Sequence, residues 1–201
     1  MADPLRFPAP PAGGPVRRSA LGGLAGELAS LPTGLRIAEV PFPGVLSLRG
    51  DAGQGEFATV VERAIGVAPV AEPGRVLTAE GCHLLCLEHD AWLAVLPSGR
   101  EETALRLLDQ ALEGLPTAAV DLSDAHVVLD LSGPLARPVL SKGCPLDLHA
   151  RALPPGRCAR SALAGLGVIV QALEGGALRL FLGVATARWA VSWLQDQVSE
   201  Y

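Results

Sequence analysis

Short apolar runs with strand-like character alternate along this chain with segments whose apolar residues recur at helical spacing. Gly and Pro, the residues that most often interrupt regular structure, bound most of these segments. The strands predicted from the short runs are 35–40, 45–49, 75–78, 82–87, 91–96, 118–122, 127–131, 157–163, 168–173 and 178–182. The helices predicted from the helical spacing are 19–31, 57–65, 98–112, 134–140 and 186–198.

The predicted elements fall into two halves, about 34–116 and 117–201, and each half has the order ββαβββα. We therefore expect an α+β fold with mainly antiparallel sheets and flanking helices. Residues 1–17 are rich in proline and predict a flexible tail, and residues 18–201 predict one domain built of the two halves. The sequence around Val45 resembles that around Val128, which leaves gene duplication and chance resemblance both open.

Two helices carry further local predictions. Ser98 with Glu101 three residues later is typical of a capping box, so the helix is expected to begin at Ser98. In the last helix, Trp189 and Trp193 are four residues apart and predict core positions or anchors of an interface.

Composition narrows the class of protein. Apolar residues make up 49% and charged residues 18% of the 201 residues, which excludes a disordered chain and suggests that some apolar surface forms an interface. A formal charge of −5 and scattered Lys and Arg argue against a nucleic-acid partner. Without a signal peptide or an apolar run of about 20 residues, we expect a cytoplasmic protein that does not cross a membrane.

The cysteines are Cys82, Cys86, Cys144 and Cys158. Cys82 and Cys86 lie near His83 and His89, which raises the question of a zinc site. On a strand with a rise of about 3.3 Å per residue, however, the two thiols are too far apart to share one tetrahedral ion. Free buried thiols are the expectation for all four in a reducing compartment.

The other candidate residues have structural interpretations beside the functional ones. Asp121, Ser123 and Asp124 form either a ligand site or, as we favour, an Asx/Ser turn between two strands. Lys142 in Lys142-Gly143-Cys144-Pro145 either activates the Cys144 thiol or, as we favour, completes the end of a helix with Gly143 as its terminal glycine.

No conventional active site follows from the remaining residues. Three serines and two histidines lack the setting of a nucleophile, and the glycine pairs lack the setting of a phosphate loop; these are Ser123, Ser132, Ser161, His126, His149, Gly22-Gly23 and Gly165 to Gly167. We assign no catalytic, cofactor-binding or metal-binding residue to this chain.

Several segments together resemble the gamma subunit family of the heterotetrameric sarcosine oxidases. The most specific of them is the block from Val139 to His149, which reads Val-Leu-Ser-Lys-Gly-Cys-Pro-Leu-Asp-Leu-His. Shorter matches include Val40-Pro41-Phe42-Pro43-Gly44, Leu48-Arg49-Gly50, Asp90-Ala91-Trp92-Leu93, Val120 to His126, Leu131-Ser132-Gly133-Pro134, Ala187-Arg188-Trp189 and Trp193-Leu194. The family more often has an acidic residue where Ala91 stands. The resemblance covers roughly residues 34–194.

This resemblance implies a structural subunit without catalysis of its own, in a complex with alpha, beta and delta subunits. The complex demethylates sarcosine oxidatively to glycine and forms hydrogen peroxide and, with tetrahydrofolate, methylene-tetrahydrofolate. The cofactors implied (flavins, NAD and tetrahydrofolate) are expected on the partner subunits and none on this chain. The resemblance also implies the fold of the folate-binding domain of aminomethyltransferases.

Catalytic members of that fold have an acidic residue after a Gly-x-Gly segment, in the folate site. Here Gly165-Leu166-Gly167 is followed by aliphatic residues, which favours a scaffold. The alternative is a stand-alone folate-binding protein of the same fold. One branch with a role in iron–sulfur enzyme maturation also has Lys-Gly-Cys, but continues into Gly-Gln, whereas this chain continues into Pro145-Leu146-Asp147.

Overall fold

The computed structural model describes residues 18–24, 34–53 and 55–201. Its strands are β1 (Arg36–Glu39), β2 (Gly44–Arg49), β3 (Val76–Ala79), β4 (Cys82–Glu88), β5 (Ala91–Leu96), β6 (Ala118–Asp121), β7 (His126–Ser132), β8 (Cys158–Leu163), β9 (Leu166–Ala172) and β10 (Leu178–Gly183). Its helices are α2 (Gly55–Ile65), α3 (Glu101–Ala111), α4 (Ala136–Ser141), α5 (Val184–Val198) and the 3-10 turn Glu174–Gly176.

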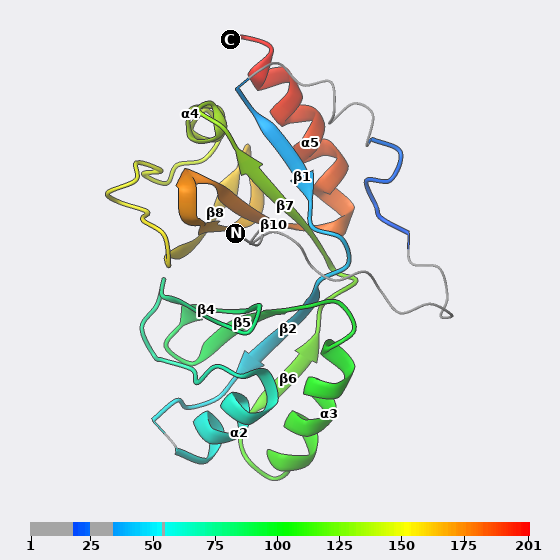
Figure 1. Cartoon of the computed structure of the whole chain (residues 1–201), viewed down its shortest axis with the longest axis vertical. Coiled ribbons are helices and arrows are strands. Elements are labelled where there is room, and N and C mark those ends of the chain that lie inside the picture. The colour runs from blue at the N-terminus through cyan, green and yellow to red at the C-terminus, as the bar shows by residue number, and fades with distance from the viewer. Residues whose placement is uncertain (1–17, 25–33, 54) are drawn as a thin grey trace. The chain divides into compact units, whose positions relative to one another are not determined.

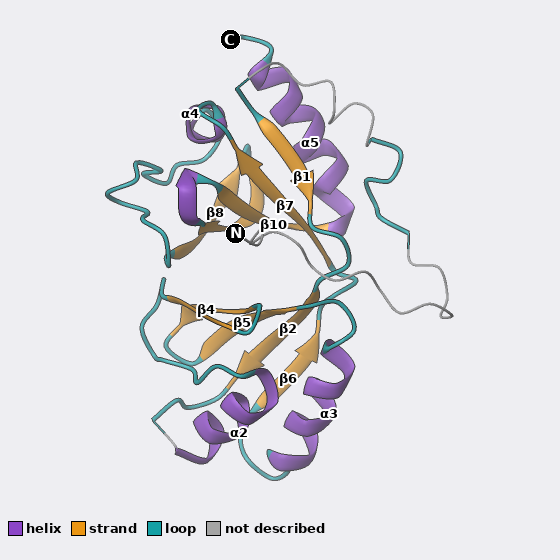
Figure 2. Ribbon diagram, viewed as in Figure 1, coloured by secondary structure: helices purple, strands orange, loops and turns teal. Residues whose placement is uncertain are grey.

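These elements form two antiparallel five-stranded sheets with flanking helices, which confirms the predicted α+β class (Figure 2). Every predicted strand is present, to within two residues at either end. Among the described residues, no helix is both long and apolar enough to span a bilayer. The part of the predicted helix 19–31 that is described, residues 19–24, forms turns instead, because Gly22 and Gly23 disfavour a helix. Its remainder lies outside the described residues.

The first compact unit includes Pro41–Asp124 and holds the sheet β3-β4-β5-β2-β6 (Figure 1). Helices α2 and α3 cover one face of this sheet. Side chains alternate across each strand, so every second residue of β2, Leu46 and Leu48, points into the core beneath the helices. Phe57 of α2 packs there against Trp92 of β5, with ring centroids 5.6 Å apart.

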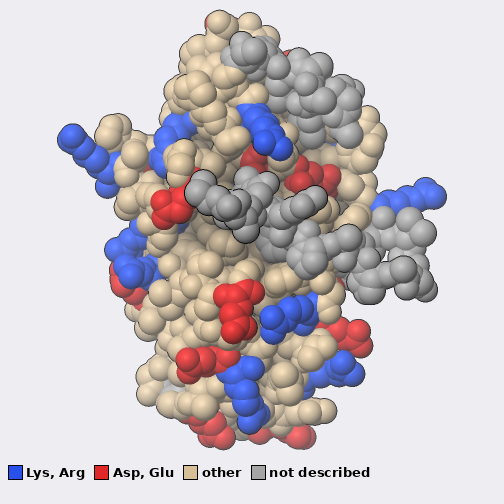
Figure 3. Space-filling view, viewed as in Figure 1, with Lys and Arg blue, Asp and Glu red and all other residues tan. Residues whose placement is uncertain are grey.

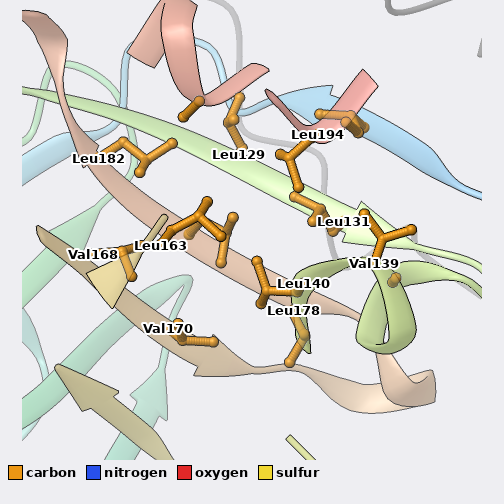
Figure 4. Packing of buried hydrophobic residues seen from close by; sticks show 14 of the residues in the cluster. Leu129, Leu131, Val139, Leu140, Leu163, Val168, Val170, Leu178, Leu182 and Leu194 are labelled. Atoms are coloured by element: carbon orange, nitrogen blue, oxygen red, sulfur yellow. The ribbon is translucent and has the colours of Figure 1, made fainter. Parts of the chain in front are cut away.

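The second compact unit includes residues 18–40 and Ala125–Tyr201 and holds the sheet β1-β7-β10-β9-β8. Helices α4 and α5 pack on one face of it. Leu129 and Leu131 of β7 meet Leu140 of α4 and Leu194 of α5 in a closely packed aliphatic core (Figure 4). On the face drawn in Figure 3, acidic and basic side chains are interspersed and form no single basic patch.

The two sheets have equivalent strand orders when the order of the second sheet is read from β8 to β1. β3-β4-β5-β2-β6 corresponds to β8-β9-β10-β7-β1. Each sheet therefore has as its outer strand β6 or β1, the strand that comes directly before β7 or β2 of the other sheet in the chain. β1 pairs with β7, and β6 pairs with β2. The strand pairing therefore does not follow the division into residues 34–116 and 117–201, although the element order of each half is ββαβββα.

The predicted start of the helix at Ser98 is wrong, and of the two alternatives predicted for Trp189 only an interface anchor remains. Helix α3 begins at Glu101 with Arg100 at the N-cap and no side-chain cap, so Ser98 is not its capping residue. Glu101 is buried, and a Cβ on Gly44 would lie 2.9 Å from its carboxylate oxygen, so tertiary packing places this helix start. Trp189 is also not a core residue, because 48% of it is exposed.

Candidate functional site

A pocket of about 240 Å³ lies at one end of the second sheet. The described residues that line it are His126, Arg160, Ser161, Gly167, Val168, Ile169, Phe181 and Gly183. It brings together one of the predicted serines, one of the predicted histidines and the segment after Gly165. None of these eight side chains is a carboxylate, so the pocket offers Arg160 and His126 as its polar walls over an apolar floor.

The local sequence explains this arrangement. Ala164 and Gly165 form the two-residue turn between β8 and β9, with φ of 46° and 89°. Positive φ at both positions is the geometry of a tight hairpin turn, and it makes Gly165 a turn residue rather than part of a ligand cradle. The turn places Val168 on the core face of β9 and Ile169 on the opposite face.

A second pocket, of about 580 Å³, lies where β2 ends and β5 begins in the first unit. Two segments that carry the family resemblance meet here: the Gly50 N–H donates to the Asp90 carbonyl at 3.1 Å, and Arg49 lies 3.5 Å from the Asp90 carboxylate. Arg49 is half exposed and also lies 3.7 Å from Glu88. Exposed ion pairs of this kind contribute about 0–1 kcal/mol, so they position the strand ends more than they stabilise them.

Gly50 has a packing role at the same place. A Cβ on Gly50 would lie 2.5 Å from the Phe57 ring, so only glycine leaves room for this aromatic side chain. The matching Gly133 has a φ of 100°, and a Cβ there would lie 2.4 Å from the Gly34 carbonyl oxygen. The repeated Leu-x-Gly pattern thus marks the end of β2 in the first unit and of β7 in the second.

The block from Val139 to His149 is built into the second unit by contacts at Lys142, Gly143 and Cys144. The Lys142 ammonium donates to the Gln197 carbonyl at 2.9 Å and to Glu200 at 2.6 Å. It also lies 4.5 Å from the centre of the Tyr201 ring. Lys142 is thereby tied to the end of α5 and does not activate the neighbouring thiol.

Gly143 differs from its predicted role as a left-handed helix terminus, because its φ lies outside the left-handed region. The Trp193 indole lies directly over it, so that a Cβ on Gly143 would be 2.6 Å from two ring carbons. The Gly143 carbonyl also accepts a hydrogen bond from the Ala164 N–H at 2.8 Å. Close approach of an aromatic ring is therefore what requires glycine here.

All four cysteines are free and buried, as predicted. Burial raises the pKa of Cys82 to about 12, with the charge of Arg100 opposing the shift, and burial also raises the pKa of Cys86. Thiols with raised pKa values are poor nucleophiles at neutral pH. Cys144 packs in the core of the second unit as a small apolar residue, 3.6 Å from the Ser161 hydroxyl.

Cys82, Cys86, His83 and His89, for which the sequence raised the question of a zinc site, do not come together. Cys82 and Cys86 both point into the core under α2 and α3, whereas His83 contacts Thr78 at 3.2 Å and the His89 side chain is 82% exposed. Within residues 18–24, 34–53 and 55–201, no three His, Cys, Asp or Glu side chains are placed to hold a metal ion.

The polar cluster after β6 is the turn that the sequence favoured. The Asp121 carboxylate accepts from the Ser123 N–H at 2.8 Å and from the Ser123 hydroxyl at 2.5 Å. The Ser123 hydroxyl oxygen in turn accepts from the Val45 N–H at 3.0 Å. These bonds end the pairing of β2 with β6. His149, another candidate, accepts from the Arg151 N–H at 3.2 Å and forms part of a local turn.

Sequence reasoning missed a buried ion pair in the middle of the second sheet. Arg179 of β10 and Asp130 of β7 are cross-strand neighbours, joined by two hydrogen bonds of 2.7 and 2.9 Å. Both residues are almost completely buried. The signal in the sequence was one charged residue in each of two apolar strands: an acidic one in 127–131 and a basic one in 178–182.

A comparison with protein families places these features in a known context. Residues 49–200 match the model of the sarcosine oxidase, gamma subunit family. The chain belongs to this family. Named gamma subunits support the assignment: the one from Corynebacterium sp. (strain P-1) is 34% identical over 189 residues, covering 92% of each chain. The gamma subunit from an Arthrobacter species is 33% identical over 192 residues, again covering 92% of each chain.

Solved structures agree with the gamma subunit assignment. A chain of the heterotetrameric sarcosine oxidase from Corynebacterium sp. U-96 is 31% identical, with a TM-score of 0.84 over 92% of this chain and 95% of that one. Aminomethyltransferase T from Bartonella henselae is only 16% identical, with a TM-score of 0.58 over 87% of this chain and 48% of that one. The second likeness shows the fold alone and confirms the expected aminomethyltransferase-like architecture.

Proposed function

We propose that this chain is the gamma subunit of a heterotetrameric sarcosine oxidase and that its role in the complex is structural rather than catalytic. The observation that carries the proposal is the likeness, along nearly its whole length, to one chain of the Corynebacterium heterotetramer. Its partners are then alpha, beta and delta subunits. The complex would convert sarcosine to glycine with formation of hydrogen peroxide and methylene-tetrahydrofolate in the cytoplasm.

The local chemistry of the chain supports a structural role. Lys142, Gly143 and Cys144 are occupied by packing and by contacts to α5, and the Asp121 cluster is a turn. The Arg179–Asp130 pair is buried, and its two hydrogen bonds lie within the sheet. Flavins, NAD and tetrahydrofolate are accordingly assigned to the partner subunits. The exposed indole of Trp189 is typical of a residue that another protein chain covers.

Co-expression of the four subunits, with and without this chain, tests the proposal. We expect this chain to co-purify with the other three subunits, and its omission to lower the yield of assembled complex. Sarcosine-dependent hydrogen peroxide formation per bound flavin should be unchanged in whatever complex still assembles. If the chain stays monomeric while the other subunits assemble with full activity, the proposal is wrong.

The pocket in the second unit tests the non-catalytic part separately. Arg160→Gln, His126→Asn and Ser161→Ala change its polar lining. If the chain has no active site, each variant that assembles should leave turnover per flavin unchanged. A large loss of turnover in a fully assembled complex would show that this chain contributes to catalysis.

The same pocket favours the alternative function, a stand-alone folate-binding protein. Its apolar floor with Arg160 beside it suits a planar anionic ligand. Titration of the isolated chain with tetrahydrofolate separates the two functions. Micromolar binding that Arg160→Gln removes would favour the alternative. Absence of binding, together with co-purification with the other subunits, would favour the structural subunit.

A further inference from the structure

The outer edge of the first sheet is exposed along β6. β6 pairs with β2 on one side, and it is the last strand of that sheet. Three of its four residues are exposed. They include a large apolar residue, Val120, of which 50% is exposed. The other side of β6 therefore presents backbone groups to solvent.

The pairing register shows which backbone groups these are. The Leu122 N–H donates to the Val45 carbonyl, so positions 118, 120 and 122 are the ones that exchange hydrogen bonds with β2. In an antiparallel pair the alternate residues point their N–H and C=O groups the other way. Ala119 and Asp121 therefore direct theirs toward the open edge, in the spacing that a further strand would match.

The usual devices that protect an edge strand are weak at β6. Charged side chains, proline and bulges commonly prevent another strand from adding to an edge. The β2–β6 register has no bulge, and Ala118, Ala119 and Val120 carry no charge. The single acidic residue, Asp121, is turned back onto Ser123 by two hydrogen bonds. Within the part of the chain that the structure describes, the short length of β6 is the protection that remains at this edge.

The equivalent edge strand of the second unit is different. β1 occupies the place in its sheet that β6 occupies in the first, and it begins with Arg36 and ends with Glu39. Residues 18–24 of the same chain lie against it, because the Ser19 hydroxyl donates to the Glu39 carboxylate at 2.5 to 2.7 Å and Leu21 is buried in the core beside it. Among residues 18–24, 34–53 and 55–201, a segment covers one of the two equivalent edges and none covers the other.

We propose that the β6 edge receives an extended segment of another subunit of the sarcosine oxidase complex, which adds a sixth strand to the sheet β3-β4-β5-β2-β6. The inference rests on the proposed function for the identity of the partner. The outward N–H and C=O groups of Ala119 and Asp121 supply the main-chain bonds, as in other recognition by strand addition. Val120 supplies an apolar contact for a side chain of the added strand.

Hydrogen exchange in the assembled complex tests this at single residues. The amides of Ala118 and Val120 bond to β2 and should exchange slowly whether or not a partner is present. The amides of Ala119 and Asp121 should exchange slowly only if a further strand covers the edge. Fragmentation of the exchanged chain in a mass spectrometer would resolve this alternation. Fast exchange at 119 and 121 in the complete complex would overturn the proposal.

A substitution supplies an independent test. Ala119→Pro removes the outward donor and places a ring in the path of an added strand, and it leaves the bonds to β2 in place because those come from residues 118 and 120. Loss of two bonds at this edge should weaken capture of the other subunits roughly tenfold. The matched control is Ala162→Pro, which faces the open side of β8.

The outcomes separate the two proposals. Weakened capture with Ala119→Pro, and normal capture with the control Ala162→Pro, supports strand addition at β6. Unchanged capture with Ala119→Pro overturns it while leaving the proposed function intact. A homodimer of the isolated chain that Ala119→Pro disrupts would replace the partner subunit by a second copy and overturn the assignment. If the unaltered chain does not co-purify with the other subunits, the proposed function itself fails.

Discussion

At the scale of single residues, one missing Cβ determines how α5 packs onto the segment after α4. Gly143→Ala would place a methyl group 2.6 Å from the Trp193 ring, so the indole or the backbone must shift. Such overpacking costs about 1–3 kcal/mol, and we expect urea unfolding to show a loss of this size. The matched control is Gly167→Ala, where nothing lies within 4 Å of the added Cβ and the backbone is not left-handed.

Gly167→Ala should be neutral or should stabilise the chain by up to about 1 kcal/mol, because alanine loses less conformational entropy than glycine on folding. Equal losses for the two substitutions would show that the contact between Gly143 and Trp193 does not determine the packing.

The buried pair of Asp130 and Arg179 leads to a second prediction at this scale. Arg179→Met removes one partner and leaves the Asp130 carboxylate without its bidentate bonds in a buried setting. Breaking such a pair costs about 3–5 kcal/mol, measured as the change in free energy of unfolding. The double variant Asp130→Leu with Arg179→Met removes both charges and should recover most of that loss. If the double variant is less stable than the single one, the pair is itself a net source of stability.

The Cys82 thiol makes stability depend on alkaline pH. Burial raises its pKa in the folded chain to about 12 from 9.0, so the folded state keeps this proton after the unfolded state has lost it. The contribution is therefore complete below pH 9 and is lost as the pH rises from about 9 toward 12. The free energy of unfolding should fall more steeply over this range in the unaltered chain than in Cys82→Ala. Parallel curves for the two proteins would contradict this assignment.

At the scale of elements, sequence pattern predicted most of the structure and failed where distant contacts decide. Strands such as β7 and β10 followed from their short apolar runs, because such runs are typical of buried strands. The start of α3 did not follow from pattern, because packing of Glu101 against Gly44 overrides the capping signal at Ser98. The candidate pocket could not be predicted from the sequence either, because its lining comes from four strands whose order in the sheet no local pattern encodes.

The uncapped start of α3 leads to a prediction at the same scale. Arg100 occupies the N-cap without a side-chain bond, and its positive charge lies at the end of the helix that favours negative charge. Arg100→Asp places a favourable negative charge at this end of the helix, and it should raise the free energy of unfolding by about 0.3–1 kcal/mol. Arg106→Asp, an exposed change of the same charge inside α3, is the control and should not stabilise the chain.

At the scale of the whole molecule, the exchange of outer strands determines which fragment of the chain holds a complete sheet. All strands of the first sheet, together with α2 and α3, lie within Pro41–Asp124. A fragment cut by sequence halves, residues 34–116, lacks β6 and includes β1, whose partner β7 is then missing. Without β6, β2 becomes the edge strand of the sheet, and Val45, Ser47 and Arg49 lose their pairing with β6.

Fragment 41–124 should therefore unfold at a higher temperature, and more cooperatively, than fragment 34–116 when both are followed by circular dichroism. Adding residues 117–124 to fragment 34–116, to give 34–124, should restore the higher unfolding temperature, because it restores β6. Removing residues 34–40 from fragment 34–116, to give 41–116, should not restore it. If 34–116 is as stable as 41–124, β6 contributes little to the first unit. In that case β6 would be held less stably in the sheet than its pairing with β2 indicates, and its edge would bind a partner strand less well.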